Sequence, residues 1–170
     1  MKTADSLERE RYHVWLEKFK AYLNPGAVVY DIGKSAKYDY APMFAEYKYL
    51  TIDKDFNKKP DLVRDVEDVD DLIGINIPEA IICNGVVEQC ENPFILFQNL
   101  FGLLEPEGIM LVGTVLTGFP VYDNDRFRFT EMGIKNTLKD YKLLESETIY
   151  RPEVKDPTYM YLLIQKTLEV

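Results

Sequence analysis

Histidine and cysteine are scarce in this sequence, which has one histidine and two cysteines among 170 residues. Zinc and similar metal centres need several such ligands at short spacings, so we expect no metal site of that kind. Acidic side chains alone could still hold Mg²⁺. The two cysteines, Cys83 and Cys90, flank the end of a predicted strand. Untied cysteines are typical of a cytosolic protein, so we expect a cytoplasmic location.

The sequence also lacks a long hydrophobic run. No apolar stretch approaches the roughly 18 residues that a membrane-spanning helix needs. The opening segment, MKTADSLERERYHVW, carries acidic side chains early and has no apolar core of a signal peptide. These absences predict a chain with no membrane span and no signal peptide.

Positive charge is the third shortage, because 20 lysines and arginines stand against 29 aspartates and glutamates, a net charge of −9. Such a surface repels nucleic-acid backbones, so we expect no DNA or RNA partner. The expected partners are a small-molecule acceptor and proteins, the latter as a homodimer or as another subunit of a complex. With 46% hydrophobic residues, the chain is globular rather than disordered.

Glycine is scarce at the place where dinucleotide-binding proteins concentrate it. Between Gly26 and Gly74 the only glycine is Gly33, so the pattern G-x-G-x-x-G is absent. A pyrophosphate needs several bare backbone N–H groups at the start of a helix. The sequence therefore argues against NAD or FAD, and it leaves open a nucleoside without phosphates, such as S-adenosylmethionine.

The stretch from Ala27 to Asp55 has the order of a nucleotide-binding half-site: strand, glycine-containing turn, short helix, second strand and an acidic pair. Asp31 comes at the end of the first strand, and Asp53 follows it by 22 positions, which is the spacing of one βαβ unit. A carboxylate at this second place can accept both hydroxyls of a ribose. Asp55 is the alternative ribose ligand if the strand ends two residues further on.

Hydrophobic periodicity and turn residues divide the chain into alternating helices and strands. We predict helices over 4–23, 41–47, 93–104 and 130–138, with Thr130 as an N-cap, and a loop or helical turn over 66–74. We predict strands over 27–32, 48–52, 62–64, 80–83, 109–115, 142–149 and 159–166. A short loop joins the last two strands, so they form a hairpin. The expected fold is a doubly wound Rossmann-like α/β sheet, mostly parallel with a C-terminal antiparallel hairpin, with helices on both faces. We expect a single domain over 1–170, with an N-terminal helix in 1–25 and an α/β core over 26–170.

Five segments, in this order, resemble a class I S-adenosylmethionine-dependent methyltransferase of the group that acts on small molecules and glycans. They are Asp31–Gly33 for the first cofactor turn, Tyr49–Asp53 for the ribose strand, Pro60–Glu67 for the adenine edge, Ile82–Pro93 with Leu103–Gly108 around the fourth strand and its helix, and Asp125–Ile134 for the acceptor-side loop. The likeness covers the chain from about Val28 to Leu138.

The resemblance implies S-adenosyl-L-methionine as cofactor and a set of residues that bind it. Gly33 would let the backbone pass close to the cofactor, and Asp53 would bind the ribose. Asp65 would take the adenine amino group, while Asn84 and Gly85 would line the methionine end. The full implied set is Asp31, Gly33, Lys34, Asp53, Asp65, Val66, Asn84 and Gly85.

Further implied roles concern the methionine end and the acceptor. Asp31 would orient the first loop or meet the α-amino group of the cofactor, and Lys34 could meet its carboxylate. An acceptor that must lose a proton needs a base. Asp123 and Asp125 are the candidates for that base, and a salt bridge within their loop is the alternative interpretation.

Three positions depart from the family pattern. Ser35 stands where a second glycine is usual, so a side chain there would be strained at positive φ, or could crowd the methionine part of the cofactor. Gln89 stands where histidine is common after Glu88, and Glu107 replaces a glycine. We expect a methyltransferase acting on a small-molecule or glycan-type acceptor; the alternative is a catalytically inactive, methyltransferase-like binding subunit of a biosynthetic complex.

Overall fold

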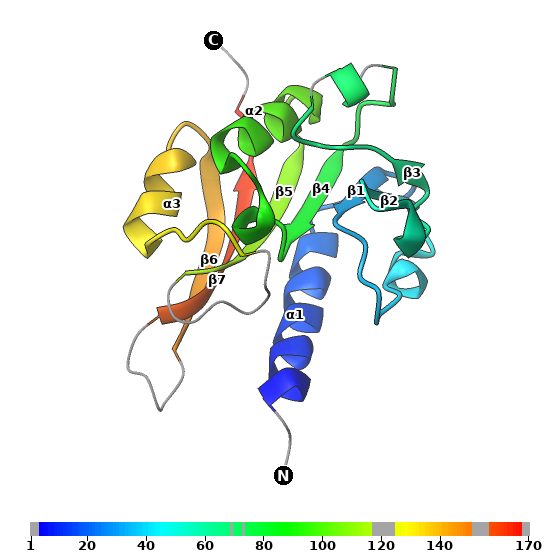
Figure 1. The fold of residues 1–170 in the computed structure, drawn as a ribbon. Helices are drawn as coiled ribbons and strands as arrows, with labels where there is room; N and C mark the ends of the chain where they lie inside the picture. The colour runs from blue at the N-terminus through cyan, green and yellow to red at the C-terminus, as the bar shows by residue number, and fades with distance from the viewer. Residues whose placement is uncertain (1–3, 69, 73, 117–124, 151–156, 168–170) are drawn as a thin grey trace.

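The computed structural model describes residues 4–68, 70–72, 74–116, 125–150 and 157–167, with residues 4–8 described by their backbone alone. Its centre is a seven-stranded sheet in the order β3-β2-β1-β4-β5-β7-β6 (Figure 1). The strands are β1 (Val28–Ile32), β2 (Lys48–Asp53), β3 (Leu62–Val63), β4 (Ala80–Asn84), β5 (Ile109–Val115), β6 (Lys142–Tyr150) and β7 (Pro157–Gln165). The α-helices of the described residues are α1 (Ala4–Lys20), α2 (Pro93–Leu103) and α3 (Glu131–Thr137).

The sheet is parallel from β1 to β5, and β7 pairs antiparallel with both β5 and β6. This confirms the predicted mixed sheet with its C-terminal hairpin. The central strands β4 and β5 are buried on both faces, which explains why their sequences, AIICN and IMLVGTV, are almost wholly apolar. Because parallel strands end at the same edge of the sheet, the loops after β1, β2 and β4 meet there.

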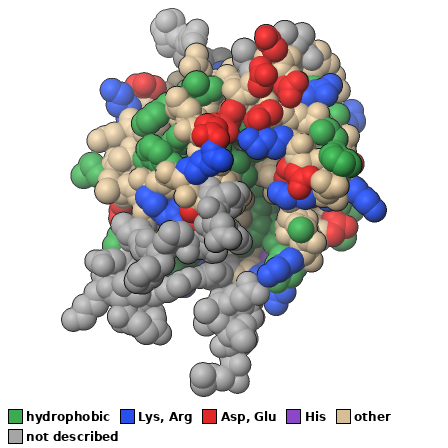
Figure 2. Space-filling view, viewed as in Figure 1, with side chains coloured by type: hydrophobic (Ala, Val, Ile, Leu, Met, Phe, Trp, Pro, Cys, Tyr) green, Lys and Arg blue, Asp and Glu red, His purple; other side chains and the backbone are tan. Residues whose placement is uncertain are grey.

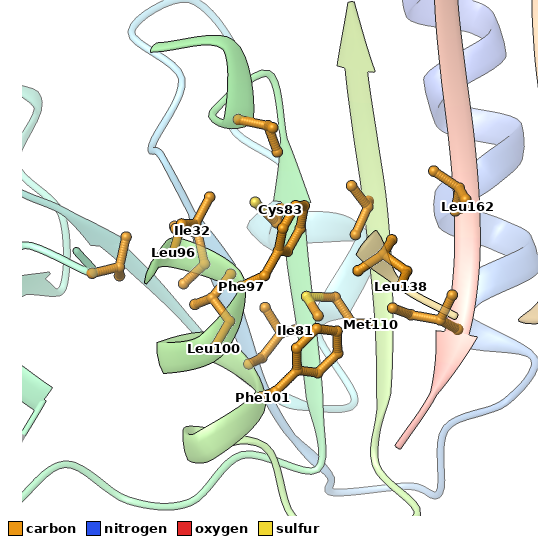
Figure 3. Close-up of a cluster of buried hydrophobic side chains, with 14 of the residues drawn as sticks. Ile32, Ile81, Cys83, Leu96, Phe97, Leu100, Phe101, Met110, Leu138 and Leu162 are labelled. Atoms are coloured by element: carbon orange, nitrogen blue, oxygen red, sulfur yellow. The ribbon is translucent and has the colours of Figure 1, made fainter. Parts of the chain in front are cut away.

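Helices cover both faces of the sheet, as predicted. On one face α1 packs Trp15, Leu16 and Phe19 against alternate side chains of the central strands. On the other face α2 and α3 pack against the opposite set of strand side chains (Figure 3). The buried residues of that second layer include Ile32, Ile81, Cys83, Leu96, Phe97, Leu100, Phe101, Met110, Leu138 and Leu162. Each large apolar side chain buried in these layers stabilises the fold by about 1.5–3 kcal/mol.

Polar contacts fix α1 against the C-terminal hairpin. Trp15 Nε1 donates a hydrogen bond to Glu147 Oε2 at 2.8 Å, and Lys18 forms an ion pair with Glu145 at 2.7 Å. Both glutamates belong to β6. Tyr12 lies one turn before Trp15 and lines a cavity at the carboxyl edge of the sheet. Helix α1 therefore brings an aromatic side chain to the edge where the strand-end loops meet.

The segment between β1 and β2 differs from the predicted helix over 41–47. It forms a short 3₁₀ helix, Ala41–Phe44, with Pro42 in its first turn. Phe44 is 1% exposed and stacks on Tyr49 with ring centroids 4.8 Å apart. Because this ring is fixed in the core and β2 begins soon afterwards, the segment has no room for a longer helix.

Other boundaries differ by a few residues from the prediction. Helix α1 ends at Lys20 rather than at residue 23, and 3₁₀ helices that were not predicted follow β2 (Phe56–Lys58) and β4 (Val87–Gln89). The helical-turn alternative for 66–74 corresponds to the 3₁₀ helix Asp70–Leu72. Thr130 is the predicted N-cap of α3, since its Oγ1 accepts from Gly133 N at 3.0 Å. Within the part of the chain that is described, no helix has the length and apolarity to cross a membrane.

The turn before β5 holds Glu107 in the left-handed backbone region, at φ 62°. A residue with a Cβ loses about 1–2 kcal/mol there, and glycine does not. We expect Glu107→Gly to raise the free energy of unfolding by about 1 kcal/mol, as measured by chemical denaturation. Glu107→Ala is the control because it removes the charge but keeps the Cβ. An equal gain in both variants would assign the effect to the charge and contradict the backbone explanation.

Candidate cofactor and acceptor site

A cavity of about 750 Å³ lies at the edge of the sheet where β1, β2 and β4 end. This volume is within the range of small-molecule sites, about 300–1,000 Å³, and the position is the usual one for ligands of open α/β sheets. The structure brings all eight predicted cofactor residues together around this cavity: Asp31, Gly33, Lys34, Asp53, Asp65, Val66, Asn84 and Gly85.

The turn after β1 depends on Gly33. Its φ is +83°, and its N–H donates to Ile52 O at 2.8 Å, which ties the turn to β2. A Cβ at this position would lie 2.4 Å from Val86 Cγ2. Glycine is thus required here both by the backbone conformation and by the close approach of the segment after β4.

Ser35 does not adopt the strained conformation that a replaced glycine would have. Among the described residues, the only ones with a side chain and a positive φ are Lys59 and Glu107. The Ser35 hydroxyl oxygen instead accepts from Lys37 N at 3.2 Å and from Tyr38 N at 3.1 Å, which closes the loop. The expected strain at Ser35 is therefore absent, while its position on the cavity wall leaves the crowding hypothesis open.

The ribose candidate Asp53 is 8% exposed, and both of its carboxylate oxygens have partners. Oδ1 accepts from Asp55 N and Oδ2 accepts from Lys58 Nζ, each at 2.8 Å. Lys58 was not predicted as a site residue, because its contact with Asp53 depends on the fold of the loop after β2. A diol that binds Asp53 has to share it with Lys58 or displace that ammonium group.

The alternative ribose ligand, Asp55, caps the 3₁₀ helix after β2. Its Oδ1 accepts from both Asn57 N and Asn57 Nδ2 at 2.9 Å, and these hydrogen bonds lower the pKa of Asp55. Lys34, expected near the cofactor carboxylate, donates from Nζ to Lys59 O at 2.6 Å. Both residues line the cavity, but their side chains form hydrogen bonds within the neighbouring loops.

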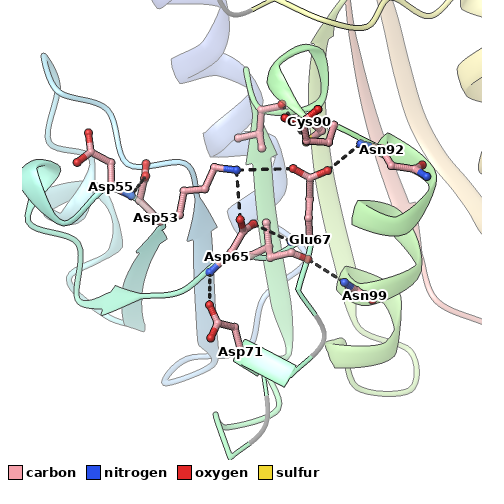
Figure 4. Close-up of polar contacts among 12 residues, drawn as sticks. Asp53, Asp55, Asp65, Glu67, Asp71, Cys90, Asn92 and Asn99 are labelled. Carbon is pink, nitrogen blue, oxygen red and sulfur yellow. Dashed lines mark hydrogen bonds and ion pairs between the residues drawn. The ribbon is translucent and has the colours of Figure 1, made fainter.

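The segment predicted for the adenine edge, Pro60–Glu67, contains β3 and is hydrogen-bonded where it continues toward the 3₁₀ helix Asp70–Leu72 (Figure 4). Asp65 Oδ1 accepts from Glu67 N at 3.0 Å, and Lys54 Nζ lies 3.2 Å from Asp65 Oδ2 and 3.8 Å from Glu67 Oε2. Asn99 of α2 donates to Val66 O at 3.0 Å. These bonds hold the Asp65 carboxylate at the cavity wall.

The turn after β4 forms the wall at the other end. Gly85 has φ +72°, and its N–H donates to Gly113 O at 2.9 Å. Tyr159 Oη donates to Asn84 Oδ1 at 2.9 Å, and Gln89 Nε2 donates to Gly85 O at 3.0 Å. Gln89, the residue that replaces the expected histidine, therefore supports the Asn84–Gly85 turn.

Asp31 is a buried carboxyl group at the end of β1, 7% exposed. The Tyr49 hydroxyl donates a hydrogen bond to its Oδ2. Burial raises the pKa of Asp31 to about 7, and the hydrogen bond from Tyr49 opposes this shift. Tyr49 was missed as a site residue, although the parallel register contains the signal. Val29 pairs with Tyr49 and Asp31 with Thr51, so Asp31 and Tyr49 lie diagonally on one face.

Glu88 is a second buried carboxyl group, 2% exposed, on the wall of the same cavity. Its Oε2 accepts from Thr114 Oγ1 at 3.2 Å. Burial raises the pKa of Glu88, although its own backbone N–H, Thr114 and Arg128 act in the opposite direction. Glu88 was not predicted as a site residue. The sequence has no local signal for this burial, because the 3₁₀ helix that Glu88 shares with the buried Val87 was not predicted.

The two candidates for an acceptor-side base have different outcomes. Asp123 lies outside the described residues. The Asp125 side chain is 3% exposed and forms an ion pair with Arg128, and Asp125 is not among the described residues that line the cavity. The structure therefore shows Asp125 in the salt bridge within its loop that was the alternative to a role as acceptor-side base. The described residues also contain no group of three histidine, cysteine, aspartate or glutamate side chains that could hold a metal ion.

Figure 2 shows acidic side chains gathered in the upper part of one face of the molecule, with basic side chains beside them. Around the cavity, Lys54 is shared by Asp65 and Glu67, and Lys58 lies against Asp53. Three carboxylates of the cavity wall, those of Asp53, Asp65 and Glu67, are therefore partly neutralised by lysines, although the chain carries a net charge of −9.

Comparison with known proteins establishes the fold. No protein-family model and no curated protein sequence matches the chain. Its sheet order and helix layers are those of class I S-adenosylmethionine-dependent methyltransferases of known structure.

Three solved structures illustrate this likeness. The N-methyltransferase NodS from Bradyrhizobium japonicum superposes with a TM-score of 0.70 at 13% identity over 95% of this chain and 97% of that one. The 1,6-didemethyltoxoflavin-N1-methyltransferase from Burkholderia thailandensis, solved with its substrate and S-adenosylhomocysteine, gives 0.68 at 17% identity over 94% and 84%. The cyclase SpnF gives 0.69 at 12% identity over 92% and 81%. At these identities the likeness is one of fold, and it includes a protein described as a cyclase.

Proposed function

We propose that this chain, whose fold is that of the class I S-adenosylmethionine-dependent methyltransferases, binds S-adenosyl-L-methionine and transfers its methyl group to a small-molecule or glycan-type acceptor. The observation that carries the proposal is the cavity of about 750 Å³, because all eight residues implied by the resemblance line it. Two of the solved structures with this fold contain bound S-adenosylhomocysteine. The proposed unit is a single domain over 1–170, located in the cytoplasm.

The residues on the cavity wall fit the parts of this cofactor. Asp53 offers a buried carboxylate to the ribose hydroxyls. Ribose binding there replaces or shares the ion pair between Asp53 and Lys58. Asp65 and the Val66 backbone offer an acceptor and a donor to the adenine edge. Asp31 offers a carboxyl group to the α-ammonium group. No cluster of basic side chains with bare backbone N–H groups is required, because the cofactor has no phosphate.

When bound, the cofactor supplies a methyl group on a sulfonium, which is reactive without help from a metal. The protein then has to align the acceptor in line with the breaking bond and keep water out. Backbone contacts at Gly33 and at the Asn84–Gly85 turn fix the two loops that border the methionine end. The expected metal independence is tested by the activity in EDTA.

Calorimetric titration of the full chain with S-adenosylmethionine and S-adenosylhomocysteine tests the proposal. We expect saturable binding of both ligands and an upward shift of the melting temperature. The absence of heat and of a thermal shift with either ligand would overturn it. A labelled-methyl assay over nucleic-acid, protein and small-molecule fractions then identifies the acceptor class, and counts in nucleic acid alone would contradict the small-molecule assignment.

Replacing the ribose ligand should weaken cofactor binding. We expect Asp53→Ala to raise the Kd of S-adenosylhomocysteine by roughly 5- to 150-fold, which corresponds to about 1–3 kcal/mol, because two hydrogen bonds to a carboxylate are lost. Calorimetric titration measures the change. Asp55→Ala is the comparison variant, since Asp55 caps a 3₁₀ helix and should affect affinity little. If Asp55→Ala weakens the affinity for S-adenosylhomocysteine more than Asp53→Ala does, then Asp55 and not Asp53 binds the ribose.

A catalytically inactive binding subunit of a biosynthetic complex is the second candidate function. The observation that favours it is Ser35, which stands on the cavity wall where the family has a glycine. Cofactor binding without methyl transfer to any acceptor pool, together with co-purification of a partner subunit, would support it. If Ser35 crowds the cofactor, Ser35→Gly should tighten binding; an unchanged or weaker affinity rules that cause out.

A further inference from the structure

The cavity has a second wall that the cofactor assignment does not use, and Glu88 is its polar element. Glu88 follows the Asn84–Gly85 turn, on the α2 side of the sheet edge, and its side chain is almost fully buried while lining the cavity. One carboxylate oxygen, Oε2, accepts from Thr114. The backbone oxygen of Glu88 accepts from Arg126 N at 2.7 Å and from Phe127 N at 3.1 Å, so the acceptor-side loop is clamped to this residue.

Another part of the cavity lining is aromatic. Tyr12 of α1, Tyr40 of the first loop and Tyr159 of β7 line it, so three separate elements contribute one ring each. Tyr12 and Tyr40 meet edge to face with centroids 5.1 Å apart, and Tyr12 stacks on Tyr161 at 6.2 Å. Tyr159 also contacts Tyr161 at 5.0 Å. The rings are held by one another, which gives the wall a defined shape.

The charges around Glu88 come from the elements packed against it. Arg128 lies on the side of the acceptor loop and favours the carboxylate, while the nearby Asp125 disfavours it. Cys83 of β4 and Cys90 also interact electrostatically with Glu88. Burial is the largest influence and raises the pKa of the Glu88 carboxyl group. A raised pKa makes its carboxylate a stronger base.

We propose that Glu88 and the aromatic lining of the cavity together select a small molecule with a basic amine as the methyl acceptor. Glu88 takes the proton that the amine nitrogen must lose before it attacks the methyl group. The proposal rests on the proposed methyltransferase function and adds to it the acceptor class and the base. An ammonium group is attracted to aromatic faces and to a carboxylate. An acceptor that carries a carboxylate or phosphate next to its nucleophile would meet the buried Glu88 carboxylate and is disfavoured.

The step balances in atoms and electrons. The ammonium form of the acceptor gives a proton from nitrogen to the Glu88 carboxylate, which becomes neutral. The freed nitrogen lone pair forms the new N–C bond to the methyl carbon while the C–S bond breaks, and that electron pair stays on sulfur as a neutral thioether. The positive charge of the sulfonium is now on the methylated ammonium product, and Glu88 returns its proton to solvent.

Fragment binding to the S-adenosylhomocysteine complex tests the acceptor class. The probes are matched sets, namely benzylamine, benzyl alcohol and benzoate, and butylamine, butanol and butyrate, observed by saturation-transfer NMR. We expect at least one amine to bind, with its alcohol and carboxylate partners weaker by about tenfold or more. Binding of an alcohol or a carboxylate as tightly as the matched amine overturns the proposal, and so does the failure of both amines to bind.

Variants then locate the amine and assign the base. Tyr40→Leu should weaken amine binding by about threefold to thirtyfold, whereas Tyr40→Phe, which keeps the ring, should not. Glu88→Gln should leave the Kd of S-adenosylhomocysteine within about twofold and lower kcat for the bound amine by about a hundredfold or more. Glu91→Gln is the matched control, because Glu91 is an exposed acid on the same segment and does not line the cavity.

The outcomes separate the two proposals. If S-adenosylhomocysteine does not bind the wild-type chain, the methyltransferase function fails and the amine proposal falls with it. If S-adenosylhomocysteine binds and labelled methyl groups appear on alcohols rather than amines, only the amine proposal is overturned. A Glu88→Gln variant that keeps both its cofactor affinity and its full kcat overturns the assignment of the base.

Discussion

Gly33→Ala should lower the free energy of unfolding by about 2–4 kcal/mol and weaken cofactor binding by about tenfold or more. The positive φ of Gly33 accounts for about 1–2 kcal/mol of that loss. The new Cβ would also lie 2.4 Å from Val86 Cγ2, so either the turn after β1 or the segment after β4 has to move. Both of these segments border the cavity, and binding depends on their relative position.

Gly26→Ala is an unusually close control for this experiment. Gly26 has the same φ, +83°, but a Cβ there would have no heavy atom within 4 Å. We expect Gly26→Ala to lose only the backbone component, about 1–2 kcal/mol, and to keep the wild-type Kd for S-adenosylhomocysteine. Chemical denaturation and calorimetric titration of both variants measure the difference. Equal effects on stability and affinity would show that close packing at Gly33 has no role in the site.

Cofactor binding should weaken as the pH falls from 7 to 5. Because burial raises the pKa of Asp31 to about 7, about half of this carboxyl group is ionised at pH 7 and about one per cent at pH 5. The α-ammonium group of the cofactor stays charged over this range and favours the carboxylate. We expect the Kd of S-adenosylmethionine to increase by up to about fiftyfold, with release of a proton on binding.

Three variants test whether Asp31 causes this pH dependence. Asp31→Asn should abolish it, Tyr49→Phe should move its midpoint above pH 7 because a hydrogen bond to the carboxylate is lost, and Glu88→Gln should preserve it. Titration in buffers of different ionisation enthalpy measures the proton release. An affinity that is constant from pH 5 to 7 in the wild-type protein contradicts the assignment.

The unliganded protein should respond to pH in the opposite direction. The folded-state pKa of Asp31 is raised above its value in the unfolded chain, so the folded protein binds the proton more tightly. The stability that this group contributes is therefore present below about pH 4 and is lost as the pH rises through 7. Thermal denaturation of wild type and Asp31→Asn over this range checks the sign.

Much of the fold could be predicted because its elements have strong local signals. The apolar run of β5 and the cap at Thr130 were sufficient to place those elements. The segment over 41–47 was mispredicted because its apolar residues serve one buried aromatic contact, at Phe44, rather than a helical face. Such a contact between distant residues leaves no periodic pattern in the sequence.

In the candidate site too, residues with a local sequence signal were predicted, and residues whose role depends on distant contacts were not. Asp31, Asp53 and Asn84 could be placed at the cavity from their positions at strand ends, because parallel strands end at one edge. Lys58 and Glu88 could not be placed there, and neither could Tyr49 be placed beside Asp31, because these contacts depend on which side chains meet across strands and loops. The burial of Glu88, in particular, is decided by residues on β5 and on the loop before α3.

The strand order has a consequence for the chain as it is synthesised. Strand β7 is made after β6 but lies between β5 and β6, so β6 has no partner in the sheet until β7 has emerged. Until then β5 presents an unpaired apolar edge, and Tyr159 is missing from the cavity. A nascent chain that stalls before residue 157 thus exposes an aggregation-prone sheet edge and has an incomplete site.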